Sequence, residues 1–423
     1  MTFSGFYKKT REERINILQK KGYLSEEKKE LLLENKSLDV NIAGKMAENH
    51  IATFSLPFCV STPIKINNKE YIIPMVTEEP SVVAALSNAG KIISKSGGFS
   101  TLVDSRLMIG QVILYDIKDI NWAILDIIKN KEKILKLANE SHPSIVKRGG
   151  GAIDISTETF QNYENEFLVV YLTVDVKEAM GANIINTMLE GIKPYLQQLT
   201  ESKSLMAILS NYATKSIVTS RCEIDIKYLH EDLEKAKEIA KKIELASKIA
   251  KLDPYRATTH NKGIFNGIDA VTIASGNDFR AIESAGHAYA TKDGKYRGLS
   301  TWTYNEDKNS LRGILSLPMP VASVGGSIGL NESVKIAREI LNNPDAKELA
   351  QIIVTVGLAQ NFSAIRALVT VGIQQGHMKL HAKSLLLLAG AKEEDVEILA
   401  EKFANIKQKN LATAKELIKN LKK

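Results

Sequence analysis

Four polar residues stand in otherwise apolar or small-residue surroundings, where a polar side chain costs free energy unless it is paired or used. They are an acid, a cation, a second acid and a histidine: Glu79, Lys262, Asp278 and His377. This set suits carbonyl chemistry, because an acid can protonate a carbonyl oxygen and a fixed cation can stabilise the negative charge that develops there. No rule of spacing brings the four together, so each one alone also admits an ordinary structural role.

Glycine-rich turns are the second candidate feature, because backbone amides approach phosphate groups closely there. The sequence contains neither the G-x-G-x-x-G fingerprint nor a P-loop, so a Rossmann fold is not supported. The best candidate is residues 174–183, where a strand ends and small residues open a helix whose N-terminal amides can receive a pyrophosphate. Close helix packing over Gly181 and Ala182 explains the same pattern, and both explanations stay open.

Metal and thiol chemistry have weaker support. His377 and His381 have helical spacing, but Met378 replaces the acid of H-E-x-x-H and no third ligand is evident, so we expect no metal site. Cys59 and Cys222 lack the context of a catalytic nucleophile. Two cysteines also exclude a disulfide framework, which fits a reducing cytoplasm.

The composition is that of an ordinary globular chain: 423 residues, 44% hydrophobic and 25% charged. At about 150 residues per domain, this length predicts about two to four domains. The net charge of +7 is spread along the chain and only 6% of residues are aromatic, so we expect no nucleic-acid partner. We find no secretory signal and no apolar run of about 18 residues, so we expect a cytoplasmic protein that does not contact membranes.

The elements that position these residues follow from the hydrophobic pattern. Residues 71–76 predict a buried strand that ends just before Glu79, and residues 81–94 predict a helix after Pro80. Strands and helices alternate between residues 106 and 211, which predicts a compact inserted subdomain. Further helices are predicted at residues 10–34, with a capping box at Thr10-x-x-Glu13, and at residues 228–251, 346–375 and 380–421.

Four segments taken together resemble the 3-hydroxy-3-methylglutaryl-coenzyme A (HMG-CoA) reductases, specifically the soluble bacterial class II enzymes. The segments are residues 79–85 (Glu-Pro-Ser-Val-Val-Ala-Ala), 178–183 (Glu-Ala-Met-Gly-Ala-Asn), 253–263 (Asp-Pro-Tyr-Arg-Ala-Thr-Thr-His-Asn-Lys-Gly) and 376–378 (Gly-His-Met). Residues 316–320 and 357–361 are similar to further family segments. Because order and spacing match from residue 48 to the C-terminal helices, the resemblance covers nearly the whole chain.

The resemblance implies an α+β fold with a large substrate-binding and dimerisation domain at residues 1–105 and 212–373. A smaller, non-Rossmann α/β domain for the nicotinamide cofactor is inserted at residues 106–211, and residues 374–423 form a mobile helical flap. It also implies a homodimer whose active site lies between two subunits, with the Glu side and the cation side contributed by different chains.

The resemblance further implies the reaction and the catalytic roles. HMG-CoA is reduced to mevalonate and coenzyme A by two hydrides, through a hemithioacetal and an aldehyde, or the reaction runs in reverse. Lys262 stabilises the oxyanion, Glu79 acts as general acid, and Asp278 holds both in one network. His377 protonates the departing thiolate.

Substrate and cofactor contacts are implied in the same way. Ser81 and Arg256 bind the free carboxylate of the substrate, with Asn211, Gln360 and Asn361 as polar partners. The cofactor contacts are Lys147, Arg148, Glu178, Met180, Gly181, Ala182, Asn183, Gly325 and Gly326.

This sequence departs from the family at residue 178, where Glu replaces the usual Asp. Lys147 and Arg148 supply positive charge just before residues 149–151, and no acid stands there. A base accepts a 2′-phosphate, whereas an acid favours a free ribose hydroxyl, so we expect a preference for NADPH, with NADH possible.

Two other functions remain as alternatives. A coenzyme A thioester hydrolase or transferase would use an acid, a histidine and a basic groove without redox chemistry. It would release coenzyme A without a reduced nicotinamide. A nucleic-acid binder would need only the positive charge and would bind with a steep salt dependence.

Overall fold

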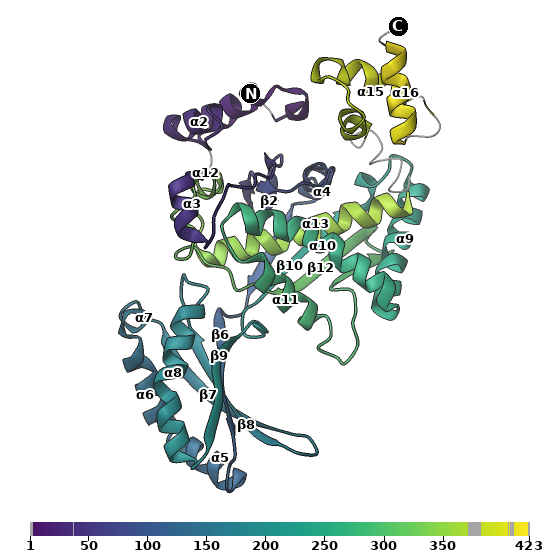
Figure 1. The fold of residues 1–423 in the computed structure, drawn as a ribbon. Coiled ribbons are helices and arrows are strands. Elements are labelled where there is room, and N and C mark those ends of the chain that lie inside the picture. The colour runs from purple at the N-terminus through teal and green to yellow at the C-terminus, as the bar shows by residue number, and fades with distance from the viewer. Residues whose placement is uncertain (1–2, 37, 371–381, 405, 407–409, 422–423) are drawn as a thin grey trace.

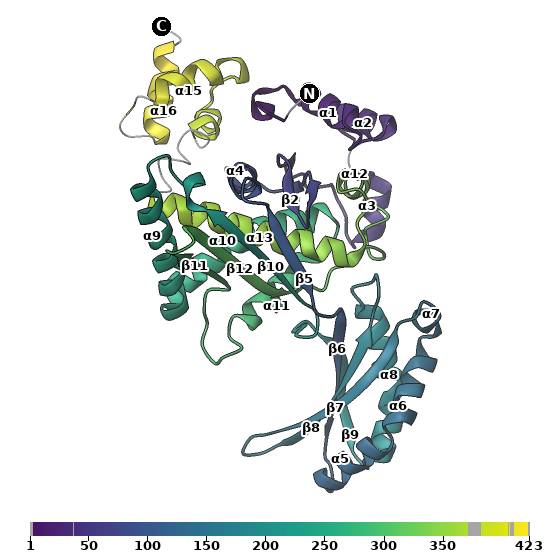
Figure 2. The same ribbon diagram turned by 180° about the vertical axis from the view of Figure 1, so that it is seen from behind.

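Residues up to 370 fold into two parts, each built around one main β-sheet and its own apolar core (Figure 1). The computed structural model describes residues 3–36, 38–370, 382–404, 406 and 410–421. The smaller part, residues 107–210, projects below the larger part in Figure 1, and Figure 2 shows the same separation from behind. The described fold is mixed α+β, as the sequence predicts.

The larger part contains a six-stranded sheet and a separate two-stranded pair. The pair is β1 (Phe58–Val60) with β4 (Pro74–Val76), and the sheet is built from β2 (Ile64–Ile66), β3 (Lys69–Tyr71), β5 (Phe99–Val103), β10 (Ile217–Asp225), β11 (Ser300–Asn305) and β12 (Ser310–Pro318). The order in the sheet is β11-β12-β10-β5-β2-β3. β10 is antiparallel to β12 and β5, whereas β2 is parallel to β5. Because β4 ends at Val76, the chain leaves the strand pair directly before Glu79.

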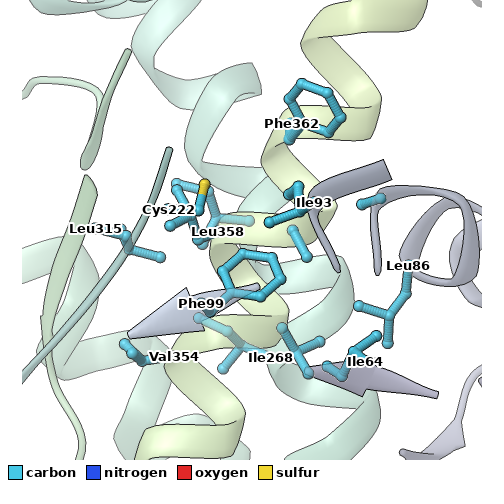
Figure 3. Packing of buried hydrophobic residues seen from close by; sticks show 14 of the residues in the cluster. Ile64, Leu86, Ile93, Phe99, Cys222, Ile268, Leu315, Val354, Leu358 and Phe362 are labelled. Atoms are coloured by element: carbon cyan, nitrogen blue, oxygen red, sulfur yellow. The ribbon is translucent and has the colours of Figure 1, made fainter. Parts of the chain in front are cut away.

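Four helices complete the larger core: α4 (Val82–Ser94), α9 (Leu233–Leu252), α10 (Pro254–Ala274) and α13 (Ala346–Val369). Figure 3 shows Phe99 of β5 among Ile93, Ile268 and Leu358, which come from α4, α10 and α13. Each such side chain contributes about 1.5–3 kcal/mol through burial. A Cβ atom on Gly267 would lie 2.9 Å from Val356 Cγ1, so this glycine lets α10 and α13 approach closely.

One helix within the described ranges, α13, is long and apolar enough to cross a membrane. In this fold, 72% of its most apolar 18-residue window is buried inside the protein. It lies along α10 and contacts β10 and β12. These contacts identify α13 as the central core helix of the larger part.

The smaller part is a four-stranded sheet covered on one face by helices (Figures 1 and 2). Its elements are β6 (Leu107–Tyr115), α5 (Ile120–Lys129), α6 (Lys131–Ser141), α7 (Pro143–Lys147), β7 (Gly151–Gln161), β8 (Glu166–Asp175), α8 (Ala182–Leu199) and β9 (Lys203–Ser210). The order is β7-β8-β6-β9 and each pair is antiparallel. This β-α-β-β-α-β arrangement is of the ferredoxin-like type. Strands and helices alternate here as predicted. Each helical connection joins two parallel strands, because the strand between them in the sheet is antiparallel to both.

The structure tests two predictions about helix starts. Thr10 and Glu13 form the predicted capping box, since Thr10 Oγ1 accepts a hydrogen bond from Glu13 N and the Glu13 carboxylate accepts one from Thr10 N. The helix expected to open within residues 174–183 begins at Ala182, directly after Gly181, which holds a turn at a φ of 101°. Only glycine adopts that conformation without steric cost.

The remaining elements are mostly helices at the periphery. They are η1 (Phe6–Lys8), α1 (Arg11–Lys20), α2 (Glu26–Leu33), α3 (Val40–Met46), η2 (Ile226–Tyr228), α11 (Phe279–Tyr289), α12 (Glu332–Ile340), η3 (Glu393–Asp395), α15 (Val396–Ala404) and α16 (Leu411–Leu421). The C-terminal helices have an apolar cluster of their own around Leu386, Leu399 and Phe403.

Candidate active site

Glu79 and Lys262 meet in one ion pair. The Lys262 Nζ atom lies 2.7 Å from Glu79 Oε2, and Asn266 Nδ2 lies 3.5 Å from Glu79 Oε1. Both charged side chains are partly open to solvent, with 60% of Lys262 and 38% of Glu79 exposed. The ammonium and the carboxyl group therefore stand side by side at an accessible surface, where both can reach one carbonyl oxygen.

A tight turn after β4 places Glu79. The backbone N–H of Glu79 donates to Thr77 Oγ1 at 3.2 Å. Ser81 then adopts a left-handed φ of 77° before α4 begins. A non-glycine residue in this region carries backbone strain, which concentrates at functional sites. The Ser81 hydroxyl is buried and has no hydrogen-bond partner within the described residues.

Helix α10 places Lys262. Asp253 caps its N-terminus by accepting hydrogen bonds from the backbone N–H groups of Tyr255 and Arg256, and Pro254 fills the first helical position. Lys262 and Asn266 are four residues apart, so they share one face of the helix. That face contacts the end of β4, which explains why both residues reach Glu79.

A cavity of about 160 Å³ adjoins the ion pair. Glu78, Glu79, Asn266, Asp269 and Phe279 are among its lining residues. Burial raises the pKa of Asp269 to about 8, and the negative charge of the neighbouring Glu283 acts in the same direction. At neutral pH Asp269 is therefore mostly protonated, within the same cavity that Glu79 lines.

Arg256 lies at the start of α10 and remains positively charged although burial lowers its pKa. Within the described residues its guanidinium makes no hydrogen bond or ion pair. Gln360 of α13 is 4% exposed, and its Oε1 atom is also buried with no partner in the part of the chain that the structure describes. A Cβ atom on Gly267 would lie 3.1 Å from Gln360 Cβ, so Gln360 packs beside the residue that follows Asn266.

Asn361 does not face this site. Its Oδ1 atom accepts hydrogen bonds from Ser300 Oγ and Trp302 Nε1, both at 2.8 Å, and its side chain is only 1% exposed. Its Nδ2 atom lies 3.2 Å from His260 Nε2. The expectation that Asn361 contacts substrate is therefore not supported, because its amide is used within the core.

The turn before α8 forms a second polar region. Gly181 caps the helix, and no side chain among the described residues caps the N-terminal amides. The turn at residues 149–151 packs against the end of β8, since a Cβ atom on Gly150 would lie 2.4 Å from the Asp175 carbonyl oxygen and 3.1 Å from Lys177 Cγ. This contact brings the end of α7 beside the turn that opens α8.

Lys147 and Arg148 lie at that end of α7. Arg148 Nε donates to the Ser144 carbonyl oxygen at 3.1 Å, while Lys147 is exposed. Ala182 and Asn183 form the first turn of α8. Gly325 and Gly326 adopt left-handed φ angles of 90° and 57° in a loop of the larger part.

Glu178 and Met180 face the larger part of the chain. The Glu178 carboxylate accepts a hydrogen bond from Ser323 Oγ and another from the backbone N–H of Ala346 at 2.8 Å. Met180 packs against an apolar cluster in the larger part. These contacts do not support direct cofactor binding by Glu178 and Met180, because both side chains are used between the two parts.

Sequence comparison decides the family. The family model described as hydroxymethylglutaryl-coenzyme A reductase matches residues 10–382. The chain belongs to the hydroxymethylglutaryl-coenzyme A reductase family. Among curated relatives, the 3-hydroxy-3-methylglutaryl-coenzyme A reductase of Archaeoglobus fulgidus is 41% identical over 418 residues, which cover 99% of this chain and 94% of that protein.

Solved structures agree with this assignment. The reductase of Streptococcus pneumoniae superposes with a TM-score of 0.87 at 53% identity, over 100% of both chains. A class II reductase structure from the same organism, bound to NADPH in open conformations, has a TM-score of 0.86 at 52% identity and covers 88% of this chain and 100% of that one. This chain is therefore an NAD(P)H-dependent oxidoreductase that acts on HMG-CoA, and the hydrolase or transferase alternative is not supported.

Two expectations about the reductase site differ from the structure. Glu79 and Lys262 make their contact within one chain, whereas the expectation assigns them to different subunits. Asp278 caps α11, where its Oδ1 atom accepts hydrogen bonds from the backbone N–H groups of Arg280 and Ala281 and pairs with Arg280 Nε at 3.2 Å. Among the described residues Asp278 bonds to neither Glu79 nor Lys262, and its Oδ1 atom is used by the helix cap.

Two other predicted residues, His377 and Asn211, are not seen at the Glu79–Lys262 pair. His377 lies outside the described residues. Asn211 is exposed in the connection between β9 and β10. Asn266 and Asp269 are site residues that sequence reasoning missed, although they follow Lys262 at positions i+4 and i+7 on one helix face. This spacing from Lys262 is the sequence signal that could have identified both residues.

Proposed function

We propose that this reductase converts HMG-CoA to mevalonate and coenzyme A at the Glu79–Lys262 pair, using two molecules of NADPH and two protons. The observation that carries this proposal is the 2.7 Å contact between an accessible ammonium and an accessible carboxyl group, with Asn266 beside them. A proton donor and a fixed positive charge at one point are what successive hydride additions to a carbonyl carbon require. The same residues serve the reverse oxidation.

NADPH, when bound, supplies one hydride in each of two reductions. In the first, Lys262 stabilises the negative charge on the thioester oxygen, and Glu79 gives that oxygen a proton to complete the hemithioacetal. The carboxyl group must be protonated before each reduction. Asp269 is a protonated, uncharged carboxyl group in the same cavity, so it adds no negative charge beside Glu79.

The hemithioacetal then breaks its carbon–sulfur bond. The hydroxyl proton returns to Glu79, the aldehyde forms, and His377 protonates the departing thiolate of coenzyme A. In the second reduction Lys262 again stabilises the oxyanion and Glu79 protonates it, which yields the primary alcohol. The net consumption is one proton for the thiol and one for the alcohol.

Arg256 and Ser81 are proposed to bind the free carboxylate of the substrate. Arg256 has no partner among the described residues, and a guanidinium binds a carboxylate with two parallel hydrogen bonds. Within the described ranges the buried Ser81 hydroxyl and the buried Gln360 Oε1 also lack partners. The hydroxyl can donate to the substrate carboxylate, and the amide oxygen can accept from the hydroxyl of the substrate. Asn211 is proposed as a further polar contact.

The cofactor is proposed to bind at the N-terminus of α8. The free amides around Gly181, Ala182 and Asn183 suit a pyrophosphate. Lys147 and Arg148 lie beside this turn and suit the 2′-phosphate of NADPH, with NADH as a poorer donor. Gly325 and Gly326 are proposed to approach the cofactor from the larger part. The NADPH-bound class II relative supports this choice of donor.

The domain organisation and assembly are also proposed. Residues 1–105 and 212–373 form the substrate-binding and dimerisation domain, residues 106–211 bind the cofactor, and residues 374–423 form a flap that carries His377. The separate apolar cores of the two sheets and of the C-terminal helices support these divisions. The enzyme is proposed to work as a cytoplasmic homodimer with its active site at the subunit interface.

The test follows absorbance of the reduced nicotinamide and release of thiol from HMG-CoA, with NADPH and NADH in parallel. Oxidation of two NADPH per thiol supports the proposal, whereas thiol release without oxidation contradicts it. The double variant Lys147→Ala/Arg148→Ala should lower the advantage of NADPH over NADH by about 10-fold through the lost phosphate contacts. Lys136→Ala, which removes an exposed lysine from α6, should leave the ratio unchanged.

A further inference from the structure

Two charged residues mark the points where the chain passes between the two parts. Arg106 immediately precedes β6, and Glu178 follows β8 by three residues. Figure 1 shows β6 rising from the smaller part toward the larger one at this junction. Both side chains form hydrogen bonds between the two parts. The reaction steps proposed above use neither residue.

Arg106 joins three separate backbone segments. Its Nη1 donates to the Ala346 carbonyl oxygen at 3.1 Å, and its Nη2 donates to the carbonyl oxygens of Val321 at 2.8 Å and Lys177 at 3.2 Å. Burial lowers the pKa of the Arg106 guanidinium, while the negative charge of Glu178 opposes this effect. The guanidinium therefore connects the turn after β8 to two segments of the larger part.

Glu178 contacts the same two segments. Its carboxylate accepts hydrogen bonds from Ser323 Oγ and from Ala346 N, the first residue of α13. A negative charge is favoured there because the amides at a helix N-terminus carry partial positive charge. The Glu178 carbonyl oxygen also accepts a hydrogen bond from Ser323 N at 2.9 Å.

The segment that receives these contacts is itself held in place. Asn277 bonds to Ala322 in both directions, with Nδ2 donating to the carbonyl oxygen at 3.1 Å and Oδ1 accepting from the N–H at 2.7 Å. Met180 packs against the apolar cluster of Ala322, Ile328 and Val334. The segment around Ala322 is therefore fixed by hydrogen bonds and apolar packing, and the turn that opens α8 packs against it.

We propose that Glu178, together with Arg106, is a positioning residue that holds the cofactor domain in register with the Glu79–Lys262 pair, and is not a cofactor ligand. This inference rests on the proposed function. Helix α13, which Glu178 holds at Ala346, packs closely along α10, which carries Lys262. Hydride transfer needs reacting atoms about 3–3.5 Å apart, and a misplacement of about 1 Å costs on the order of 100-fold in rate.

The experiment compares Glu178→Gln, Ser323→Ala and the double variant with the wild-type enzyme. Each single variant should lower kcat about 10-fold, with HMG-CoA and with free mevaldehyde equally, because both reductions need the same alignment. The dissociation constant for NADPH should stay within about twofold. The kcat of the double variant should be no lower than that of the more impaired single variant, because both substitutions remove the same interaction.

Matched controls are Glu190→Gln and Thr187→Ala, which remove an exposed acid and an exposed hydroxyl from α8 without touching the junction. Both should keep the wild-type kcat. A deuterated cofactor adds a readout that stability does not affect: slower hydride transfer should raise the kinetic isotope effect on kcat in the junction variants. A change in melting temperature with unchanged kcat would mean a merely structural role and would overturn the inference.

Other outcomes separate the possible failures. If Glu178→Gln weakens NADPH binding while Ser323→Ala does not, Glu178 is a cofactor ligand and the inference is wrong. If the wild-type enzyme oxidises no NADPH with HMG-CoA, the proposed function fails. Unchanged kcat in both single variants, with an active wild-type enzyme, contradicts the inference alone.

Discussion

Two polar clusters lie on the same helix only two residues apart, and they serve opposite purposes. Lys262 on one face of α10 has a side chain that is 60% exposed and meets Glu79. His260 is 2% exposed and lies 2.6 Å from Ser300 Oγ, in the core cluster with Asn361. One face of the helix therefore presents charge to an accessible surface, and the other places neutral polar groups in the core.

The difference shows how burial assigns a role to a polar residue. Burial, together with the positive charges of Arg256 and Lys251, lowers the pKa of His260 to about 3, so its ring stays neutral and serves packing and hydrogen bonding. Lys262 pairs with the Glu79 carboxylate and its side chain is largely exposed, so a substrate can reach its ammonium. The same short segment thus contains a structural residue and a catalytic candidate.

Removing the charge on the open face should have the largest effect. Lys262→Ala should lower kcat by on the order of 100-fold or more, because the oxyanion loses its fixed cation. The melting temperature should change little, since partly exposed ion pairs contribute little to stability. Steady-state kinetics and thermal unfolding measure both. Lys241→Ala, which breaks an exposed pair with Glu306, is the control, and comparable losses in both variants would contradict the role of Lys262.

Asn361→Ala should lower stability and leave substrate binding unchanged, which is the reverse of the effect of Lys262→Ala. It leaves the buried Trp302 Nε1 and Ser300 Oγ without their acceptor, which should lower the free energy of unfolding by about 1–3 kcal/mol. Urea unfolding measures this loss. The KM for HMG-CoA, measured on the folded fraction, should not change. A higher KM with unchanged stability would return Asn361 to the substrate site.

Acid should lower the stability of the protein through His260 on the core face. The pKa of His260 is near 3 in the folded protein and 6.5 in the reference state, so the unfolded chain binds the proton between these values. Stability should therefore fall as pH drops from about 6.5 toward 3. His260→Asn should flatten this part of the stability curve in urea unfolding at a series of pH values. Replacement of the exposed His230 should leave the curve as steep as in the wild type.

A rise in pH should lower stability through Asp269, the buried carboxyl group that lines the cavity beside the open face. The pKa of Asp269 is about 8 when folded against a reference value of 3.8, so the folded chain binds the proton between these values. Stability should therefore fall as pH rises from about 4 to 8. Asp269→Asn should remove this fall, and its advantage over the wild type should grow toward pH 8. Asp307→Asn, an exposed acid, is the matched control, and an equal gain there would refute the assignment.

Much of the site was predictable because its signals are local. The strand that ends before Glu79, the helix that follows it and the cap and proline that open α10 all follow from neighbouring residue types. Asn266 and Asp269 were missed although their spacing from Lys262 was visible. Glu178 was assigned to the cofactor because its motif resembles the family's, and Asn361 to the substrate for the same reason.

The structure gives both side chains other partners for one physical reason. A motif places a residue on a turn or a helix, but the direction of its side chain depends on which distant segment packs beside it. Glu178 meets Ser323 and Ala346, more than a hundred residues away, and Asn361 meets Ser300 and Trp302 across the core. Asp278 differs from these two, because it caps its own helix and an Asp directly before a helix is a local signal.

The sequence by itself determined the family, the reaction, the helices and strands with strong periodicity and the identity of the acid and the cation. Local hydrogen bonding and hydrophobic periodicity suffice for such features, because they involve residues a few positions apart. Only the tertiary structure decided that Glu79 and Lys262 meet within one chain, that the inserted sheet is antiparallel and that Glu178 and Arg106 join the two parts. These depend on long-range packing, where the burial of each side chain sets its charge and its partners.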